Sequence, residues 1–159
     1  MDRYLQILKI SWISALIVSI VTAILMLLFF LIYENTATYT HNDWLWSNVG
    51  IAIIMLILIF FANKYTKRQL NKIRQNDLSA KLVSYLSICR KQMFCYVLVC
   101  LFGLVAIFLS RQIELVIFDI LAILLIVNHR PTKIKVKFDL ALTEEDLAKF
   151  DNIKFQTKL

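Results

Sequence analysis

Four long apolar stretches dominate this chain, and its lysines and arginines lie almost entirely on one side of them. The stretches cover residues 10–33, 44–63, 93–109 and 113–128. Each approaches the roughly 20 helical residues that cross the hydrocarbon core of a bilayer, although the last two are near or just below the short end of that range. Backbone groups inside lipid must be satisfied within their own segment, so the sequence predicts four transmembrane helices.

The composition favours long, uninterrupted helices. The chain has 159 residues, of which 60% are hydrophobic, and it contains only two glycines and one proline to interrupt a helix. The fold class predicted is all-α, an integral membrane four-helix bundle. Residues 1–130 form its transmembrane domain, and residues 131–159 form a basic tail that is too short for a separate globular domain.

The distribution of positive charge predicts how the helices are oriented. Seventeen of the 18 lysines and arginines flank the apolar stretches on one side, and Arg111 alone lies on the other. By the positive-inside rule, both termini and the connection 64–92 are cytoplasmic. The net charge of +7 suits contact with anionic lipid headgroups. No basic surface interleaved with aromatic residues is present, so we expect no nucleic-acid partner.

The connection 64–92 is predicted to be a helical hairpin that protrudes into the cytoplasm. It contains no glycine or proline, and apolar residues recur in it at helical spacing, as Leu78, Leu82 and Tyr85 do. We expect the second helix to end near Arg74 and the third to start near Leu78. The basic surface predicted on this side consists of Lys64, Lys67, Arg68, Lys72 and Arg74, joined by Lys133, Lys135 and Lys137 from the tail.

The tail carries two local patterns. Pro131 ends the fourth helix, and residues 133–138 then alternate lysines with apolar residues. A period of two predicts a short strand or an extended segment. Thr143, followed three residues later by Asp146, resembles a capping box and predicts a short helix that runs to about Phe150.

Small residues recur every four positions in the first stretch, at Ser11, Ala15, Ser19 and Ala23. Small side chains at this spacing form a shallow groove that lets another helix approach closely. The neighbour is either a helix of the same bundle or a second copy of the chain, and the sequence leaves both open.

Asp119 is the most informative ionisable residue. It lies about 9 Å below the predicted outer boundary, among apolar neighbours, where an acid is costly and is expected to be protonated. Asn48 and Arg111 are candidate partners at similar depth, and Glu114 has the spacing of a surface pair with Arg111. Asp119 either fixes helix packing through a hydrogen bond or serves a membrane-embedded transport function.

No pattern indicates catalysis. The two histidines, His41 and His129, are predicted on opposite sides of the membrane, and no nucleophile, zinc or phosphate-loop motif is present. The three cysteines do not make a disulfide framework, because their number is odd and only Cys89 lies outside the apolar stretches. We therefore predict no enzyme activity, no cofactor and no metal site.

The second half of the chain resembles a group of small, uncharacterised bacterial four-helix inner-membrane proteins. The resemblance covers KLVSY, a helical hairpin, an apolar fourth helix and then HRPTKIKVKFDLALTEED, with the RPTK-type segment directly after the last span. It implies a bacterial inner membrane and no known activity.

Two functions from different classes follow as hypotheses. The first is a non-enzymatic interaction protein, such as a membrane subunit, adaptor or immunity- or defence-type accessory, that docks a protein partner on its basic cytoplasmic face. The alternative is an oligomeric ion channel or small transporter that uses Asp119. A pore needs Asp119 to face water, whereas a docking protein needs only its packing.

Overall fold

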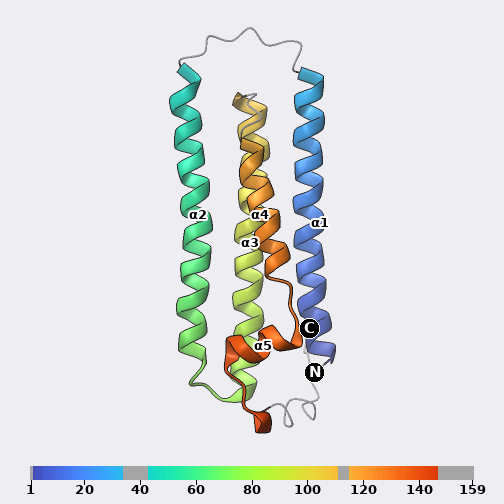
Figure 1. Cartoon of the computed structure of the whole chain (residues 1–159), viewed down its shortest axis with the longest axis vertical. Coiled ribbons are helices and arrows are strands. Elements are labelled where there is room, and N and C mark those ends of the chain that lie inside the picture. The colour runs from blue at the N-terminus through green and yellow to red at the C-terminus, as the bar shows by residue number, and fades with distance from the viewer. Residues whose placement is uncertain (1, 34–42, 111–114, 147–159) are drawn as a thin grey trace.

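The computed structural model describes residues 2–33, 43–110 and 115–146, with the side chains of residues 2, 3, 33, 43–48, 109 and 110 left out. Every element in these ranges is a helix (Figure 1). They are α1 (Asp2–Tyr33), α2 (Asp43–Ile73), α3 (Leu78–Ser110), α4 (Val116–Asn128) and α5 (Lys133–Leu140). The all-helical fold predicted from the sequence is confirmed for the described residues.

Three of the helices are long and apolar enough to cross a membrane, over Tyr4–Ile32, Val49–Ile73 and Leu78–Phe108. The fourth apolar helix, α4, has 13 residues and is therefore only about 20 Å long. Residues 111–114, where the fourth predicted stretch begins, lie outside the described residues. The chain thus has the helices of a membrane protein, three of full length and one shorter.

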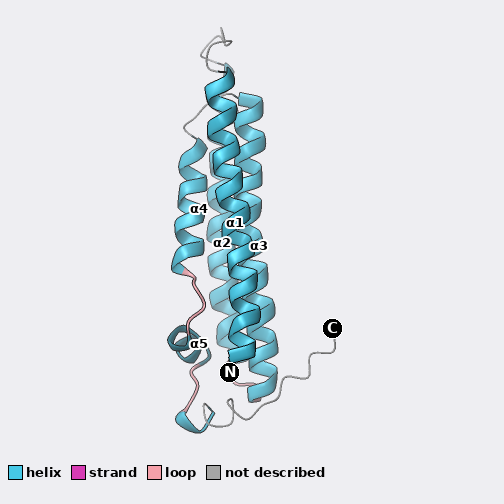
Figure 2. Cartoon of the chain, turned by 90° about the vertical axis from the view of Figure 1, so that its right-hand side faces the viewer, coloured by secondary structure: helices cyan, strands magenta, loops and turns pink. Residues whose placement is uncertain are grey.

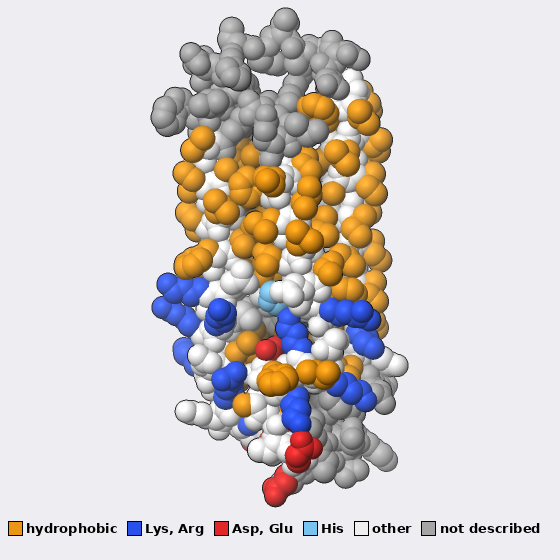
Figure 3. Space-filling model, viewed as in Figure 1, with side chains coloured by type: hydrophobic (Ala, Val, Ile, Leu, Met, Phe, Trp, Pro, Cys, Tyr) orange, Lys and Arg blue, Asp and Glu red, His pale blue; other side chains and the backbone are white. Residues whose placement is uncertain are grey.

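On the face drawn in Figure 3, an apolar belt covers the described part of the molecule above the Lys and Arg side chains. We define it by outward-facing side chains from each of the four helices, such as Ile17, Phe60, Phe102 and Ile117, all of which are half exposed or more. A helix that is apolar on its outer as well as its inner face suits a lipid environment. Below the belt, Lys and Arg side chains gather at what we call the basic end.

Helix α3 is central to the packing. It contacts α1, α2 and α4, and α4 also packs on α1. The core between them is built from fully buried side chains of all four helices, including Met26, Met55, Tyr96 and Ile126. Figure 2 shows α4 and α5 on the same side of the other three helices, one beyond the other along the long axis.

Helices α2 and α3 continue past the belt, as predicted. Helix α2 ends at Ile73 and α3 starts at Leu78, and a turn of four residues joins them. Ile73 is ten residues beyond the end of the second apolar stretch, so this extension reaches about 15 Å beyond the belt.

The first turns of α1 complete the basic end. Tyr4, Leu5 and Leu8 are buried against Leu82 and other residues of the α2–α3 extension. The Tyr4 hydroxyl donates a hydrogen bond of 2.7 Å to the backbone carbonyl of Leu82. The start of α1 therefore packs against the ends of α2 and α3 within the basic end.

The prediction of a strand or extended segment at residues 133–138 is wrong, because this segment is helix α5. Thr132 caps its first turn by accepting a hydrogen bond from the Lys135 amide, and Ala141 ends it in the left-handed conformation with φ 49°. Val136 and Leu140, four residues apart, are fully buried against the other three helices. Residues two apart point to opposite sides of a helix, so the alternating pattern fits a helix with two apolar faces.

The capping box after α5 is confirmed. The Thr143 amide donates to the Asp146 carboxylate at 3.1 Å, and the Asp146 amide donates to the Thr143 hydroxyl at 3.2 Å. A helical turn begins at Glu144, and its predicted continuation to Phe150 lies outside the described residues.

Candidate functional site

A polar network links three helices where the apolar belt gives way to the basic end. The Gln92 amide nitrogen lies 3.3 Å from Asn63 Oδ1, 2.9 Å from the Tyr96 hydroxyl and 3.1 Å from His129 Nε2. The Tyr96 hydroxyl donates to Asn63 Oδ1 at 2.6 Å. The network holds α2, α3 and the end of α4 together.

The partners of His129 indicate which ring nitrogen carries the proton. Nδ1 lies 2.8 Å from the Leu125 carbonyl, which can only accept, so Nδ1 is the donor. Nε2 then accepts from the Gln92 amide, and the ring is neutral. Burial lowers the pKa of His129, and the neighbouring Lys135 lowers it further, while the Leu125 bond and Asp139 oppose the shift.

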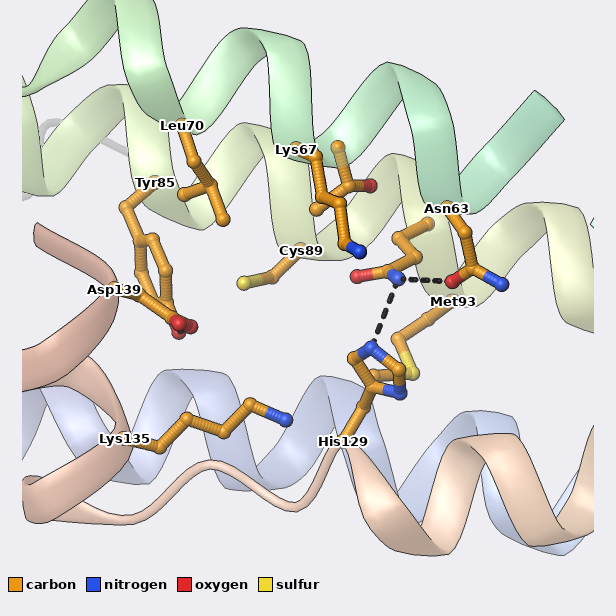
Figure 4. A pocket seen from close by; sticks show the side chains of 11 residues that line it. Asn63, Lys67, Leu70, Tyr85, Cys89, Met93, His129, Lys135 and Asp139 are labelled. Carbon is orange, nitrogen blue, oxygen red and sulfur yellow. Dashed lines mark hydrogen bonds between the residues drawn. The ribbon is translucent and has the colours of Figure 1, made fainter. Parts of the chain in front are cut away.

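A cavity of about 160 Å³ lies next to this network, and we call it the basic-end cavity (Figure 4). Residues of α2, α3 and α5, together with His129, line it: Asn63, Thr66, Lys67, Leu70, Tyr85, Cys89, Gln92, Met93, His129, Lys135 and Asp139. The volume is many times the roughly 10–15 Å³ that one water molecule needs, so a small polar ligand can enter.

Charged groups enter the cavity from two sides. Figure 4 shows the ammonium groups of Lys67 and Lys135 directed toward the space beside His129. Lys135 Nζ also donates to the Asn128 carbonyl at 3.1 Å. Burial lowers the pKa of Lys135, and the nearby Asp139 opposes that shift.

Among the described residues, one carboxylate lines the cavity, and it already accepts a hydrogen bond. Asp139 accepts a hydrogen bond of 2.8 Å from the Tyr85 hydroxyl. Its backbone carbonyl accepts a further bond of 3.2 Å from Arg74 Nε, which ties the end of α5 to the end of α2. With His129 neutral, the two lysines and this acid leave the cavity with a net positive charge.

The outward face of α5 is a second unusual feature. Ile134 and Phe138, four residues apart, are 69% and 75% exposed, and we call them the α5 apolar pair. Figure 3 shows apolar side chains at the basic end with Lys and Arg on either side of them. The opposite face of α5 is anchored in the core, so the pair is presented on a fixed helix.

Asp119 is buried inside the belt, with no exposed surface. Neither carboxyl oxygen has a hydrogen-bond partner among the described residues. It packs against α3 at Gly103, where a Cβ atom would lie 2.6 Å from Asp119 Oδ1. The acid therefore faces the interior and occupies space that only a glycine on α3 leaves free.

The other residues singled out from the sequence fall in several places. Arg111, Glu114 and the side chain of Asn48 lie outside the described residues, so their pairing with Asp119 and with each other stays a prediction. In the small-residue stripe, Ala15 and Ser19 are buried, and Ser11 and Ala23 are half-buried. The structure brings together two members of the predicted basic surface, Lys67 and Lys135, in one cavity. The remaining six are exposed or half-buried at the basic end: Lys64, Arg68, Lys72, Arg74, Lys133 and Lys137.

The sequence pattern does not predict the polar network. A weak signal exists in the four-residue spacing of Gln92 and Tyr96, which places both on one face of α3. Asn63 and His129 carry no comparable signal, because each stands at the end of a different apolar stretch. Among the described residues, no three His, Cys, Asp or Glu side chains lie together as a metal site would require.

Comparison with protein-family models, with curated proteins and with solved structures finds no match to this chain.

Proposed function

We propose that the chain is a multi-pass protein of a bacterial inner membrane, a four-helix bundle with both termini in the cytoplasm. It acts without catalysis, as a membrane adaptor that docks a protein partner on its basic cytoplasmic face. The partner contributes a segment that carries acidic and apolar residues together. The observation that carries this proposal is the α5 apolar pair, exposed on an anchored helix.

The position of α5 favours a protein partner over the membrane surface. The inner face of α5 packs against Ile73, about 15 Å beyond the end of the second apolar stretch. The hydrocarbon of the membrane ends with the apolar belt, so Ile134 and Phe138 lie beyond its reach. Two large, water-exposed apolar side chains on a fixed helix suit the anchor residues of an interface.

The surrounding charge favours an acidic partner. Lys137, on α5, is paired with Glu144 at 2.5 Å. Three further cations, from the end of α2 and the turn that follows it, lie at the same end of the molecule: Arg68, Lys72 and Arg74. An amphipathic segment that places apolar residues on Ile134 and Phe138 and carboxylates around them would match this pattern.

A photo-crosslinking amino acid in place of Phe138, in intact cells, tests the docking surface. The matched control is the same substitution at Val83, a residue of α3 that is 63% exposed. We expect position 138, but not position 83, to crosslink to a protein through an acidic segment, and the product to be lost on Ile134→Ser. Crosslinks only to lipid or to a second copy of this chain would overturn the proposed partner.

The orientation is tested separately. In a cysteine-free background, an impermeant thiol reagent applied to intact cells should label Thr38→Cys and spare Gln156→Cys. The opposite pattern would place the basic end outside the cell and remove the docking proposal with it.

A channel or small transporter is the second candidate, and the buried Asp119 carboxyl favours it. Asp119 has no hydrogen-bond partner among the described residues, and an acid inside a membrane is costly. Such an acid is therefore a candidate for a role in ion or proton transport. Reconstitution in liposomes distinguishes the two functions. A pH-dependent flux that disappears in a well-folded Asp119→Asn variant would make transport the primary function, whereas absence of flux in both leaves docking in place.

A further inference from the structure

The basic-end cavity is separate from the surface used for docking. The α5 apolar pair faces outward, whereas the cavity lies beneath α5, between α2, α3 and the end of α4 (Figure 4). The polar network occupies one of its walls and Leu70 and Met93 contribute apolar surface. One end of the cavity lies at Asn63 and His129, which stand where the apolar belt ends, and from there it extends toward Leu70 and Tyr85.

The two lysines supply what an anion needs from a site. Each ammonium carries three donors, and Lys135 spends one of them on the Asn128 carbonyl. The two reach the cavity from different helices, so an anion between them would bridge α2 and α5. It would also offset the cost of burying Lys135, whose pKa burial lowers.

A buried hydroxyl adds an uncharged donor. Thr66 lines the cavity, is only 7% exposed, and its hydroxyl oxygen has no hydrogen-bond partner among the described residues. Thr66 and Lys67 both line the cavity from α2. A buried hydroxyl without a partner is unusual and calls for an explanation, and a bound ligand provides one.

The height of the cavity suggests the chemical class of the anion. Phosphate groups of lipids lie at the boundary between hydrocarbon and water, and basic pockets between transmembrane helices on the cytoplasmic side bind such headgroups. Asn63 and His129 mark the same boundary on this chain. Free phosphate presents the same oxygens and reaches the site from water.

We propose that the basic-end cavity binds a phosphate group, held by the ammonium groups of Lys67 and Lys135 and by the Thr66 hydroxyl. The group comes from an anionic phospholipid or from free phosphate. The α5 apolar pair does not line this cavity, so phosphate binding and docking can be tested separately, by Lys135→Gln and by Ile134→Ser.

Native mass spectrometry of the full chain released from nanodiscs tests the lipid source. The nanodiscs hold equal parts of phosphatidylglycerol, phosphatidic acid and phosphatidylcholine. We expect retention of one anionic lipid per chain, weakened about tenfold by Lys67→Gln and by Lys135→Gln, since hydrogen bonds to charged groups contribute on this scale. Thr66→Val should weaken retention by a smaller factor.

Lys64→Gln is the matched control. Lys64 lies three residues before Lys67 on the same helix, is exposed, and does not line the cavity. It should retain lipid as the unchanged chain does. Lys67 is itself exposed, so Lys67→Gln is expected to fold, which thermal melting in detergent would verify for every variant.

A second arm uses inorganic phosphate with the lipid-free protein in detergent. Thermal stabilisation by phosphate that requires Lys67, without retention of anionic lipid, would identify free phosphate as the source and keep the proposed site. Equal retention of anionic lipid and phosphatidylcholine together with no response to phosphate would overturn the proposal. Equal effects of Lys64→Gln and Lys67→Gln would also overturn it, because they would assign binding to the general surface charge.

Discussion

The contact between Asp119 and Gly103 makes a sharp prediction about helix packing. An alanine at Gly103 would place its Cβ 2.6 Å from Asp119 Oδ1 and 2.8 Å from Met26 Cε. Both distances are shorter than van der Waals contact. Methionine can move aside because it is long and flexible, whereas the short aspartate side chain is fully buried and has few other rotamers to adopt. Gly103→Ala should therefore push α3 and α4 apart at this level.

The chain contains its own control for the effect of removing a glycine from a helix. Among the described residues, no other side chain and no other segment's backbone lies within 4 Å of the Cβ position that an alanine at Gly50, on α2, would have. Gly50→Ala should gain up to about 1 kcal/mol in helix propensity. Gly103→Ala gains the same amount but meets an overpacking cost of about 1–3 kcal/mol. The two variants should thus differ in free energy of unfolding by about 1–3 kcal/mol.

Unfolding in mixed micelles, titrated with SDS and followed by circular dichroism, measures this difference. The double variant Gly103→Ala/Asp119→Ala should recover most of the loss, because the added methyl group then occupies the space of the carboxyl. Equal stability of Gly50→Ala and Gly103→Ala would refute the close contact. A double variant no more stable than Gly103→Ala alone would show that Asp119 is not what the methyl group meets.

Three further predictions concern the basic end. Ala141→Gly should stabilise the chain by about 1 kcal/mol, since glycine adopts the left-handed φ of 49° without the cost that Cβ imposes, and thermal melting would detect the gain. Leu140→Ala should cost about 2–5 kcal/mol in a fully buried site and release α5, seen as faster proteolysis after Lys135, while the apolar belt stays folded. The pKa of His129 is lowered in the folded chain, where Lys135 and Asp139 are its charged neighbours, so the unfolded chain binds the proton first as pH falls below 6.5. The free energy of unfolding should therefore be full above pH 6.5 and decrease below it. His129→Gln should remove this pH dependence.

The long helices could be predicted because their causes are local. Apolar length, the lack of breakers and the spacing of Leu78, Leu82 and Tyr85 each act within a few turns of one helix, and the structure has those helices. The turn before Leu78 is local too, because Asn76 and Asp77 can cap the start of the next helix. The capping box at Thr143 is local in the same sense, because both of its partners lie within four residues.

The errors and omissions concern contacts between distant segments. Residues 133–138 form a helix because Val136 and Leu140 find a complementary surface on three other helices, and the alternating pattern carries no sign of that surface. Lys67 and Lys135 are far apart in the sequence, and both line the cavity only because α5 folds back toward α2 and α3. Depth in the fourth apolar stretch identifies Asp119 as an unusual acid, but it does not reveal that Gly103 makes room for the carboxyl.

Helix α5 also determines when the basic end can be completed during synthesis. Its buried face packs against the first turns of α1 and against the ends of α2 and α3. These surfaces therefore stay uncovered until α5 has been synthesised. The hydrogen bond from the Trp12 indole to the Ile126 carbonyl likewise joins residues 114 positions apart. Because such distant contacts form late, the first three helices should enter the membrane with an open, apolar end. The closing step then belongs to α5, and a chain interrupted before residue 133 would leave that surface exposed to other proteins.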